Sequence, residues 1–537
     1  MAATAMLAVT IGALAAMGAL AVPAVAPTEE PVAARSDDRP NVVVLMTDDQ
    51  TVADLEVMPK ARRLLAGRGV TFARSYVSYP VCCPSRATFL SGQYAHNHGV
   101  LGLYPPRGGY GRFDRENSLP VWLQRAGYAT AHIGKYMNGY GSQVPDDVPP
   151  GWTEWHGAVD DSTYRMWGYT LNENGERHTY GSPFDEDPDL YQTDVYRDKA
   201  VDFIERRAPS PRPFFLSVAF LAPHHESDAV RAGTGHLVRP APRHAGSLAD
   251  DPLPASPAFG ERDLSDKPAF MRDNSPMTAA TVRYITARHQ DRQESLLAVD
   301  EAVEAIVGAL RSRGELDDTY ILLTSDNGYM QGEHDVPSGK VLPYEPSTRV
   351  PLLVRGPGVP SDRTSKELVG NVDLAPTLVE LAAARPGKPL DGRSLLPFAR
   401  HPDRRSHRPL LHETAGPGYT PIRDHDAGEA GPVRPVLGYK AVRTVRWLYV
   451  EYSGGPRELY DLRRDPNELR SLDAAPSHRR VRTALHEVLQ RLAKCRGASC
   501  RAAARPIPGP AHPARVPVRS GGVRRQPARA IRLVANP

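Results

Sequence analysis

Two short clusters of oxygen-bearing side chains follow predicted buried strands of this chain. Asp48 and Asp49 come directly after the apolar run NVVVLM, and Asp326 and Asn327 follow a second such run. Ligands of open α/β sheets bind beyond the carboxyl ends of the strands, so these two clusters could meet. Carboxylate and amide oxygens suit calcium, magnesium or manganese better than zinc. Each pair alone also has a structural explanation, because Asp-Asp is a common helix N-cap and Asp-Asn-Gly is a turn signature.

A pair of adjacent cysteines is the third feature that could carry chemistry. Cys82 and Cys83 precede Pro84-Ser85-Arg86, and the helical pattern that begins near Ser85 places Cys82 close to a helix N-terminus. The positive end of a helix favours bound anions. Adjacent cysteines rarely form a disulfide with each other. The structural alternative is a buried cysteine pair in a core turn.

These side chains need a scaffold, and the hydrophobic pattern predicts an α/β fold with a large, mostly parallel sheet flanked by helices. Continuous apolar runs are typical of strands that are buried on both faces. Strands that alternate with helices indicate a mainly parallel sheet. A strong amphipathic helix is predicted at 293–313, and Gly314 follows it as a C-cap. The predicted strands are 41–46, 129–133, 214–220, 320–324 and 350–354, and a helical pattern follows Thr51.

Composition divides the chain into five parts. A smaller C-terminal subdomain is predicted to contain an antiparallel sheet at 439–452 and an amphipathic helix at 477–494. Cys495 and Cys500 follow that helix and could close a small loop in an oxidising compartment. The segment 221–278 lacks periodicity and is predicted to be a surface excursion near the active face. The predicted parts are a signal peptide at 1–26, a linker at 27–38, the large α/β domain at 39–400, the subdomain at 401–500 and an Arg/Pro-rich disordered tail at 501–537.

The charge of the chain is unevenly distributed. The tail holds eight arginines and no acidic residue while the whole chain carries +4, so the other 500 residues carry −4. This mildly acidic body gives no sign of nucleic-acid binding. An anion-binding role for the tail is an alternative to a solvated tail.

The N-terminal segment predicts export from the cell. It is apolar and uncharged up to Thr28, and it contains the small-residue cleavage pattern Ala24-Val25-Ala26. We therefore expect a cleaved signal peptide and a secreted protein without stable membrane insertion. A transmembrane anchor is the alternative, because the apolar run approaches spanning length.

The run CCPSRATFLSG resembles the signature of the sulfatase family, in which the first cysteine is oxidised to Cα-formylglycine. Carried over to this chain, that residue is Cys82 and not Cys83. The resemblance implies an alkaline-phosphatase-like fold. The cysteine motif, HNH, GKYMN and the terminal cysteine pair resemble the N-acetylglucosamine-6-sulfatase branch. Other segments within 39–500 resemble the family in its order, namely NVVVLMTDDQ, GKYMNGYG, PPGW, LAPH, TSDNGY, VPLLVRGPG, NVDLAPT and ELYDLRRDPNE.

The resemblance implies a role for each matching residue. The metal is expected to be calcium, bound by Asp48, Asp49, Asp326 and Asn327 with an oxygen of modified Cys82. The expected catalytic residues are Cys82 itself, Arg86 to hold the formylglycine hydrate, Lys135 and Lys340 to bind sulfate, and His224 near the leaving oxygen, with the adjacent His225 left open.

The hydrate of formylglycine explains why the cysteine must be oxidised. One of its two hydroxyls would attack sulfur, and Lys135, Lys340 and the metal would stabilise the charge that develops. The other hydroxyl would then lose its proton and expel sulfate, a step that serine could not perform. Many sulfatases have a histidine two residues after the first lysine, but this chain has Met137. His132 and Asn138 are candidates for the missing base, although a structural role is the simpler interpretation of each.

We therefore predict a secreted sulfuric ester hydrolase. Its expected substrates are sulfated saccharides, such as 6-O-sulfated glucosamine, or aryl sulfates. A formylglycine-generating enzyme is the expected partner during maturation, and no nucleic-acid partner is expected. One alternative is a phosphate- or phosphonate-monoester hydrolase of the same superfold, because a fold alone does not determine chemistry. Another is a non-catalytic sulfated-glycan-binding protein in which Cys82 is never modified.

Overall fold

The computed structural model describes residues 37–142, 147–207, 211–272, 276–415 and 437–510. The predicted signal peptide and most of the predicted tail lie outside these ranges. Within the described ranges, every helix is too short or too polar to cross a membrane.

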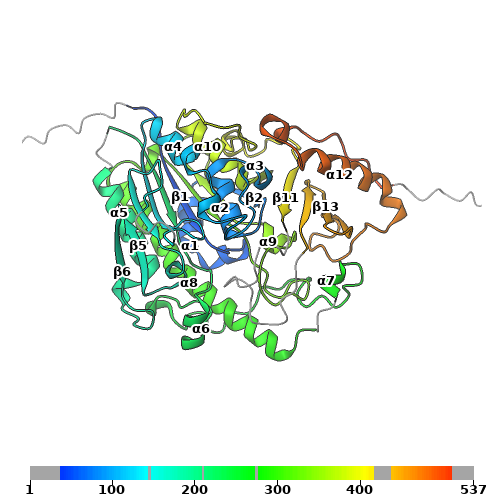
Figure 1. The fold of residues 1–537 in the computed structure, drawn as a ribbon, viewed down its shortest axis with the longest axis horizontal. Coiled ribbons are helices and arrows are strands. Elements are labelled where there is room, and N and C mark those ends of the chain that lie inside the picture. Colours follow the sequence, from blue (N-terminus) through cyan, green and yellow to red (C-terminus); the bar gives the residue numbers. More distant parts are fainter. Residues whose placement is uncertain (1–36, 143–146, 208–210, 273–275, 416–436, 511–537) are drawn as a thin grey trace, which may run out of the picture.

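A ten-stranded sheet forms the centre of the larger part of the molecule, as can be followed in Figure 1. Its strand order is β10-β2-β9-β8-β1-β7-β3-β4-β5-β6. All strands run in one direction except β9 and β5, which are antiparallel to both of their neighbours. The prediction of a large, mostly parallel sheet is confirmed. The strands are β1 (Asn41–Thr47), β2 (Val70–Tyr76), β3 (Ala129–Lys135), β4 (Glu154–Ala158), β5 (Tyr169–Glu173), β6 (Glu176–Tyr180), β7 (Phe214–Ala219), β8 (Thr319–Ser325), β9 (Leu352–Arg355) and β10 (Arg363–Gly370).

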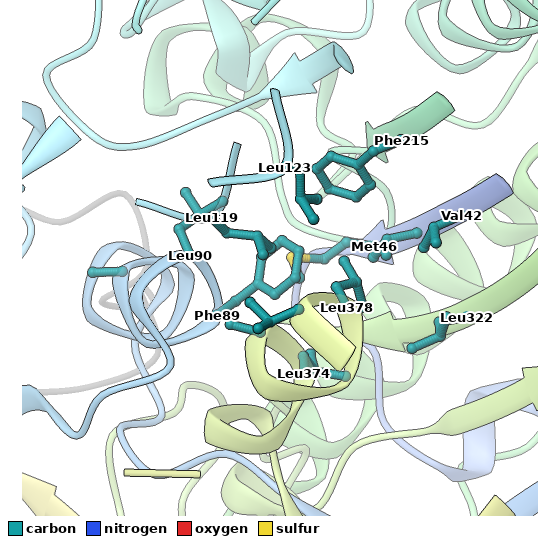
Figure 2. Packing of buried hydrophobic residues seen from close by; sticks show 14 of the residues in the cluster. Val42, Met46, Phe89, Leu90, Leu119, Leu123, Phe215, Leu322, Leu374 and Leu378 are labelled. Atoms are coloured by element: carbon teal, nitrogen blue, oxygen red, sulfur yellow. The ribbon is translucent and has the colours of Figure 1, made fainter. Parts of the chain in front are cut away.

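Helices cover both faces of this sheet. Successive residues of β1 point to opposite faces, so Val42, Val44 and Met46 join one core while Val43 and Leu45 join the other. Helices α2, α4 and α10 pack on the first face, as Figure 2 shows, and α5 and α8 pack on the second. The helices are α1 (Pro59–Ala61), α2 (Cys82–Ser91), α3 (Ala95–His98), α4 (Leu119–Arg125), α5 (Gln192–Arg207), α6 (Asp228–Thr234), α7 (Ala269–Arg272), α8 (Ala279–Ser312), α9 (Glu345–Thr348), α10 (Leu374–Leu381), α11 (Leu396–Arg400) and α12 (Arg479–Leu492).

A second, four-stranded antiparallel sheet forms the C-terminal part of the chain. It consists of β11 (Leu410–Thr414), β12 (Tyr439–Arg443), β13 (Trp447–Tyr452) and β14 (Arg457–Asp461). Helix α12 packs its apolar stripe of Val481, Leu485, Val488, Leu489 and Leu492 against this sheet. The predicted antiparallel sheet, the helix and the Cys495–Cys500 disulfide are all present.

Three details differ from the predicted elements. Helix α8 begins at Ala279 rather than 293, because the hydroxyl of Thr278 accepts a hydrogen bond from Thr281 N at 3.1 Å and caps an earlier start. The helical pattern after Thr51 forms three short pieces, and Pro59 starts the second because its ring fits a first helical turn. The segment 221–278 is not wholly a surface excursion, since residues 237–241 are buried.

Candidate active site and metal centre

The candidate site lies where four adjacent parallel strands of the large sheet end. The strands β8, β1, β7 and β3 are neighbours in this order. Thr47 and Ser325, the last residues of β1 and β8, are paired in register, so the two predicted oxygen clusters leave the sheet side by side. Asp48 and Asp49 follow β1, Asp326 and Asn327 follow β8, Lys135 is the last residue of β3, and His224 lies in the turn after β7.

Two backbone features bring the strand ends close together. Gly134 in β3 has a φ of +99°, and a Cβ atom there would lie 2.2 Å from the carbonyl oxygen of Ala219, so only glycine fits before Lys135. Asp49 also has a positive φ, of 68°. Its backbone N–H donates to Asp326 Oδ1 at 3.4 Å, which links the two acidic loops directly.

Cys82 is the first residue of α2 and is fully buried. The helix thus begins three residues earlier than the pattern at Ser85 indicated. The Cys82 Sγ atom lies 3.4 Å from Asp48 Oδ1 and 3.0 Å from Lys340 Nζ. Lys340 reaches this position from the loop after β8, and the neighbouring Val341 N–H donates to the carbonyl oxygen of Pro80 at 3.2 Å.

The oxygen donors fit a divalent cation such as calcium. Asp48 and Asp49 each offer a carboxylate oxygen, Cys82 its sulfur and His224 a ring nitrogen, all within 4.8 Å of one another; the predicted ligand Asp326 is not part of this group. The Oδ2 atom of Asp49 and the Oδ1 atom of Asn327 are buried and accept no hydrogen bond from the described residues. Buried oxygens without donors are costly unless a cation or another group satisfies them. The donor set is rich in hard oxygen atoms, which calcium and magnesium prefer.

Three cationic side chains balance the three carboxylates of the site. Arg86 Nε donates to Asp326 Oδ2 at 2.7 Å, and Arg86 Nη2 donates to Asp48 Oδ2 at 3.1 Å. Lys135 pairs with Asp48, and Lys340 Nζ donates to Asp49 Oδ1 at 2.6 Å. Because these charges cancel, a bound divalent cation would leave the site positive, which suits an anionic substrate.

Burial and these charges set the protonation states. Burial opposes ionisation of Asp48, but Lys135 and its other cationic neighbours outweigh it and hold the pKa of Asp48 well below its usual value. Burial and the nearby Asp48 raise the pKa of Asp326 to about 6. Burial and Asp48 also raise the pKa of the Cys82 thiol well above its ordinary value. The unmodified Cys82 is therefore a neutral thiol and a poor nucleophile at neutral pH.

The two adjacent histidines are both buried, and one of them faces the acidic cluster. His224 Nδ1 donates to the carbonyl oxygen of His225 at 2.7 Å. This leaves His224 Nε2 directed toward the site, 3.8 Å from Asp49 Oδ2. The His225 ring stacks on the His224 ring with the centroids 4.3 Å apart. The centroid of the Tyr164 ring lies 5.0 Å from the centroid of the His224 ring and 4.4 Å from Lys135 Nζ.

The candidates for the missing base occupy structural positions. The His132 ring stacks on Trp155 with the centroids 4.9 Å apart, and burial lowers its pKa to about 3. Met137 belongs to the hydrophobic core of the same face. Asn138 Nδ2 donates to Tyr164 Oη at 2.7 Å, which links Asn138 to the tyrosine ring that contacts His224.

Arg292 is a site residue that the sequence analysis missed. It lies on α8 with 1% of its surface exposed. Its Nη2 donates to the carbonyl oxygen of Asp49 at 2.7 Å, and its Nη1 donates to the carbonyl oxygen of Pro223 at 3.1 Å. Arg292 thus ties the loop after β1 to the loop that carries His224. The predicted helix began one residue after Arg292. Recognition of Thr278 as an N-cap would have started the helix earlier and placed Arg292 inside it.

Comparison with known proteins identifies the family of the chain. Residues 40–384 match the family model described as Sulfatase, and residues 332–495 match the model described as N-sulphoglucosamine sulphohydrolase, C-terminal. The chain is 32% identical over 502 residues to the N-acetylglucosamine-6-sulfatase of Capra hircus, covering 87% of this chain and 86% of that protein. The resemblance stated from the sequence motifs is confirmed.

Two further comparisons cover different shares of the matched proteins. The extracellular sulfatase SULF-1 homolog of Drosophila melanogaster is 34% identical over 368 residues, which are 67% of this chain but 31% of that protein. The chain therefore spans about a third of that relative's length. A solved structure of a protein in complex with its substrate D-glucosamine-2-N,6-O-disulfate superposes with a TM-score of 0.69 and 22% identity, covering 84% of this chain and 97% of that one. At this identity the likeness shows the fold alone.

Proposed function

The chain belongs to the sulfatase family, and we propose that it hydrolyses sulfate monoesters with a formylglycine made from Cys82 beside a bound calcium ion. One observation carries the proposal. Cys82 Sγ, which stands where a formylglycine oxygen would lie, sits between Asp48 Oδ1 and Lys340 Nζ at 3.4 and 3.0 Å. Its neighbours are thus a carboxylate that could take a proton or bind a cation and an ammonium group that could hold sulfate.

Both added groups have a defined chemical contribution. When formylglycine is present, its hydrate supplies a nucleophilic hydroxyl and a second hydroxyl for the release of sulfate. When calcium is bound, it supplies positive charge and lowers the pKa of an adjacent hydroxyl. The proposed ligands are Asp48, Asp49, Asp326, Asn327 and the modified residue 82.

The remaining residues of the site would position and stabilise the reacting groups. Lys135 and Lys340 would bind the sulfate oxygens, because both buried ammonium groups lie at the site and Lys340 Nζ is 3.0 Å from Cys82 Sγ. Arg86 bridges Asp48 and Asp326 and would hold the hydrate in place. Because His224 Nδ1 donates to the His225 carbonyl, only the imidazolium form of His224 would give a proton from Nε2 to the leaving alcohol oxygen.

The burial of Cys82 restricts when it can be modified. The side chain is fully buried within α2, so an enzyme could not reach it in the folded protein. We propose that a formylglycine-generating enzyme acts before folding is complete. The names of the relatives support secretion and a sulfated saccharide substrate such as a 6-O-sulfated N-acetylglucosamine. An aryl sulfate is the expected assay substrate.

Mass spectrometry of the tryptic peptide SYVSYPVCCPSR tests the proposal. Formylglycine at residue 82 has one oxygen in place of the sulfur, the thiol hydrogen and one Cβ hydrogen, and fragment ions distinguish residue 82 from residue 83. Fully active protein that carries an unmodified Cys82 thiol would refute the mechanism. An inactive, unmodified protein that binds sulfated saccharides would favour the glycan-binding alternative.

Parallel rate measurements separate sulfate from phosphate chemistry. Hydrolysis of an aryl sulfate and of the matching aryl phosphate should be compared at the same pH and calcium concentration. We expect the sulfate to react faster, because the relatives are sulfatases and the Cys-x-Pro-Ser-Arg motif is present. A large preference for the phosphate would support the phosphate- or phosphonate-monoester hydrolase instead.

A further inference from the structure

A cavity of about 470 Å³ lies away from the active site, near the opposite ends of the strands. We call it the arginine cavity, because Arg63, Arg68, Arg311 and Arg355 line it. Arg355 ends β9, which is antiparallel to β8, and it pairs with Ile321 near the start of β8. Asp326 is five residues further along, or roughly 16 Å at 3.3 Å per residue. The volume falls within the range of small-ligand pockets.

Three separate segments of the chain contribute the four arginines. Arg63 lies on the short helix Arg62–Ala66, Arg68 on the turn after it, Arg311 on the last turn of α8 and Arg355 at the end of β9. The Arg355 Nη1 atom donates to the carbonyl oxygen of Leu64 at 3.0 Å, so this group is held in place.

The charges of the arginine cavity are poorly compensated. Arg63 pairs with Glu304 at 2.7 Å. Among the residues that the structure describes, Arg68, Arg311 and Arg355 form no ion pair. The acidic lining is limited to Asp317. Burial, together with repulsion from Arg311 and Arg68, lowers the pKa of Arg355 although Asp317 opposes this shift. Solvent screens the exposed Arg63, Arg68 and Arg311 in part, and a bound anion would relieve the remaining repulsion between these like charges.

Helix electrostatics explains only part of this arrangement. Arg311 stabilises the negative C-terminal end of α8, as cations at helix ends do. Arg68 lies in a turn and Arg355 in a strand, so the same reason does not apply to them. Planar guanidinium groups match the oxygens of tetrahedral oxyanions, and four arginines line this one cavity.

We propose that the arginine cavity binds a sulfate or phosphate group, either as the free ion or carried on an anionic saccharide chain. The site is separate from the catalytic centre and does not depend on the function proposed for it. A sulfated polymer held there would be retained close to the enzyme, because a second point of attachment raises the effective concentration of the chain.

Isothermal titration calorimetry on the full-length protein tests this proposal. The probes are inorganic sulfate, inorganic phosphate and a heparin-derived hexasaccharide. The variants are Arg311→Gln and Arg355→Gln, and the matched control is Arg62→Gln. Arg62 lies next to Arg63 but outside the cavity, where it pairs with Glu56 at 3.0 Å. All three variants lose one positive charge, so a difference between them reports on position rather than on net charge.

We expect Arg311→Gln and Arg355→Gln each to weaken binding of at least one probe by about tenfold, since each removes a charge-assisted hydrogen bond. The Kd of the Arg62→Gln variant for each probe should stay within about twofold of that of the unmodified chain. A loss seen with the free ions identifies an oxyanion site, and a loss seen only with the hexasaccharide identifies a site for saccharide-borne sulfate. Equal binding by the cavity variants and the control overturns the proposal. If Arg355→Gln unfolds, the exposed Arg311 and Arg68 provide variants that keep the test decisive.

Discussion

Replacing Lys340 by methionine tests the electrostatic design of the candidate site. Methionine keeps most of the length of the side chain but removes the ammonium group that lies 2.6 Å from Asp49 Oδ1 and 3.0 Å from Cys82 Sγ. The reaction would lose one preorganised positive group at the sulfate. Removal of one such group typically costs about 10²–10³-fold in rate, so we expect kcat/KM on an aryl sulfate to fall by that factor.

The same substitution should change stability in a way that depends on calcium. Without Lys340, Asp49 keeps a buried charge without its ammonium partner, and breaking a buried pair costs about 3–5 kcal/mol. An unfolding entropy of about 2.1 cal/mol/K per residue gives roughly 1 kcal/mol/K for a chain of this length, so the Tm should fall by about 3–5 °C in EGTA. Calcium should restore most of this loss, because the ion would provide the missing positive charge beside Asp49.

Two assays separate these effects. Initial rates on an aryl sulfate give kcat/KM, and differential scanning fluorimetry in EGTA or excess calcium gives the Tm. Lys366→Met is the matched control, because Lys366 is exposed on β10 and should change neither value. A Lys340→Met protein with wild-type turnover would refute the role of Lys340. A calcium-dependent rise in Tm no larger than that of the unmodified chain would argue against a cation site at Asp49.

Three further predictions follow from the same geometry. Cys82→Ser should abolish turnover while Cys83→Ser keeps substantial activity, as measured with an aryl sulfate, and the reverse result would show that the other cysteine is modified. Arg292→Leu should weaken calcium binding, measured by calorimetry, by at least about tenfold, because the loop of Asp49 loses a charged hydrogen-bond donor. A lower Tm with unchanged calcium affinity would show that Arg292 has a purely structural role. Burial lowers the pKa of His132 from 6.5 to about 3. Between these pH values the unfolded chain binds a proton that the folded chain excludes, so the free energy of unfolding falls by about 1.4 kcal/mol for each pH unit of acidification. In the His132→Phe variant, the pH dependence of the free energy of unfolding, measured with urea, should lack the contribution of one proton, and turnover should be unchanged. A large loss of turnover would instead identify His132 as the missing base.

Some predictions from the sequence differ from the structure, either because of a local breaker or because the deciding contact is distant. The run after Thr51 has helical spacing, yet it folds into short pieces around Pro59. The predicted strand 350–354 exists, but its antiparallel direction depends on pairing with β8 and β2. Residues 237–241 looked like surface loop and are buried, in part because Arg239 pairs with the buried Glu226 at 2.7 Å. Periodicity reports local preference and cannot show such partners.

The sequence by itself determined that acidic and amide side chains stand at the ends of buried strands, and that Cys82 opens the motif of a sulfatase. These features are local, because a continuous apolar run specifies a buried strand and the residue after it must emerge at the edge of the sheet. Only the tertiary structure decided that Thr47 and Ser325 are in register, that Arg292 joins two loops, and that four arginines surround a cavity. Such contacts join residues far apart in the chain, so they arise from strand order and helix packing rather than from any single segment.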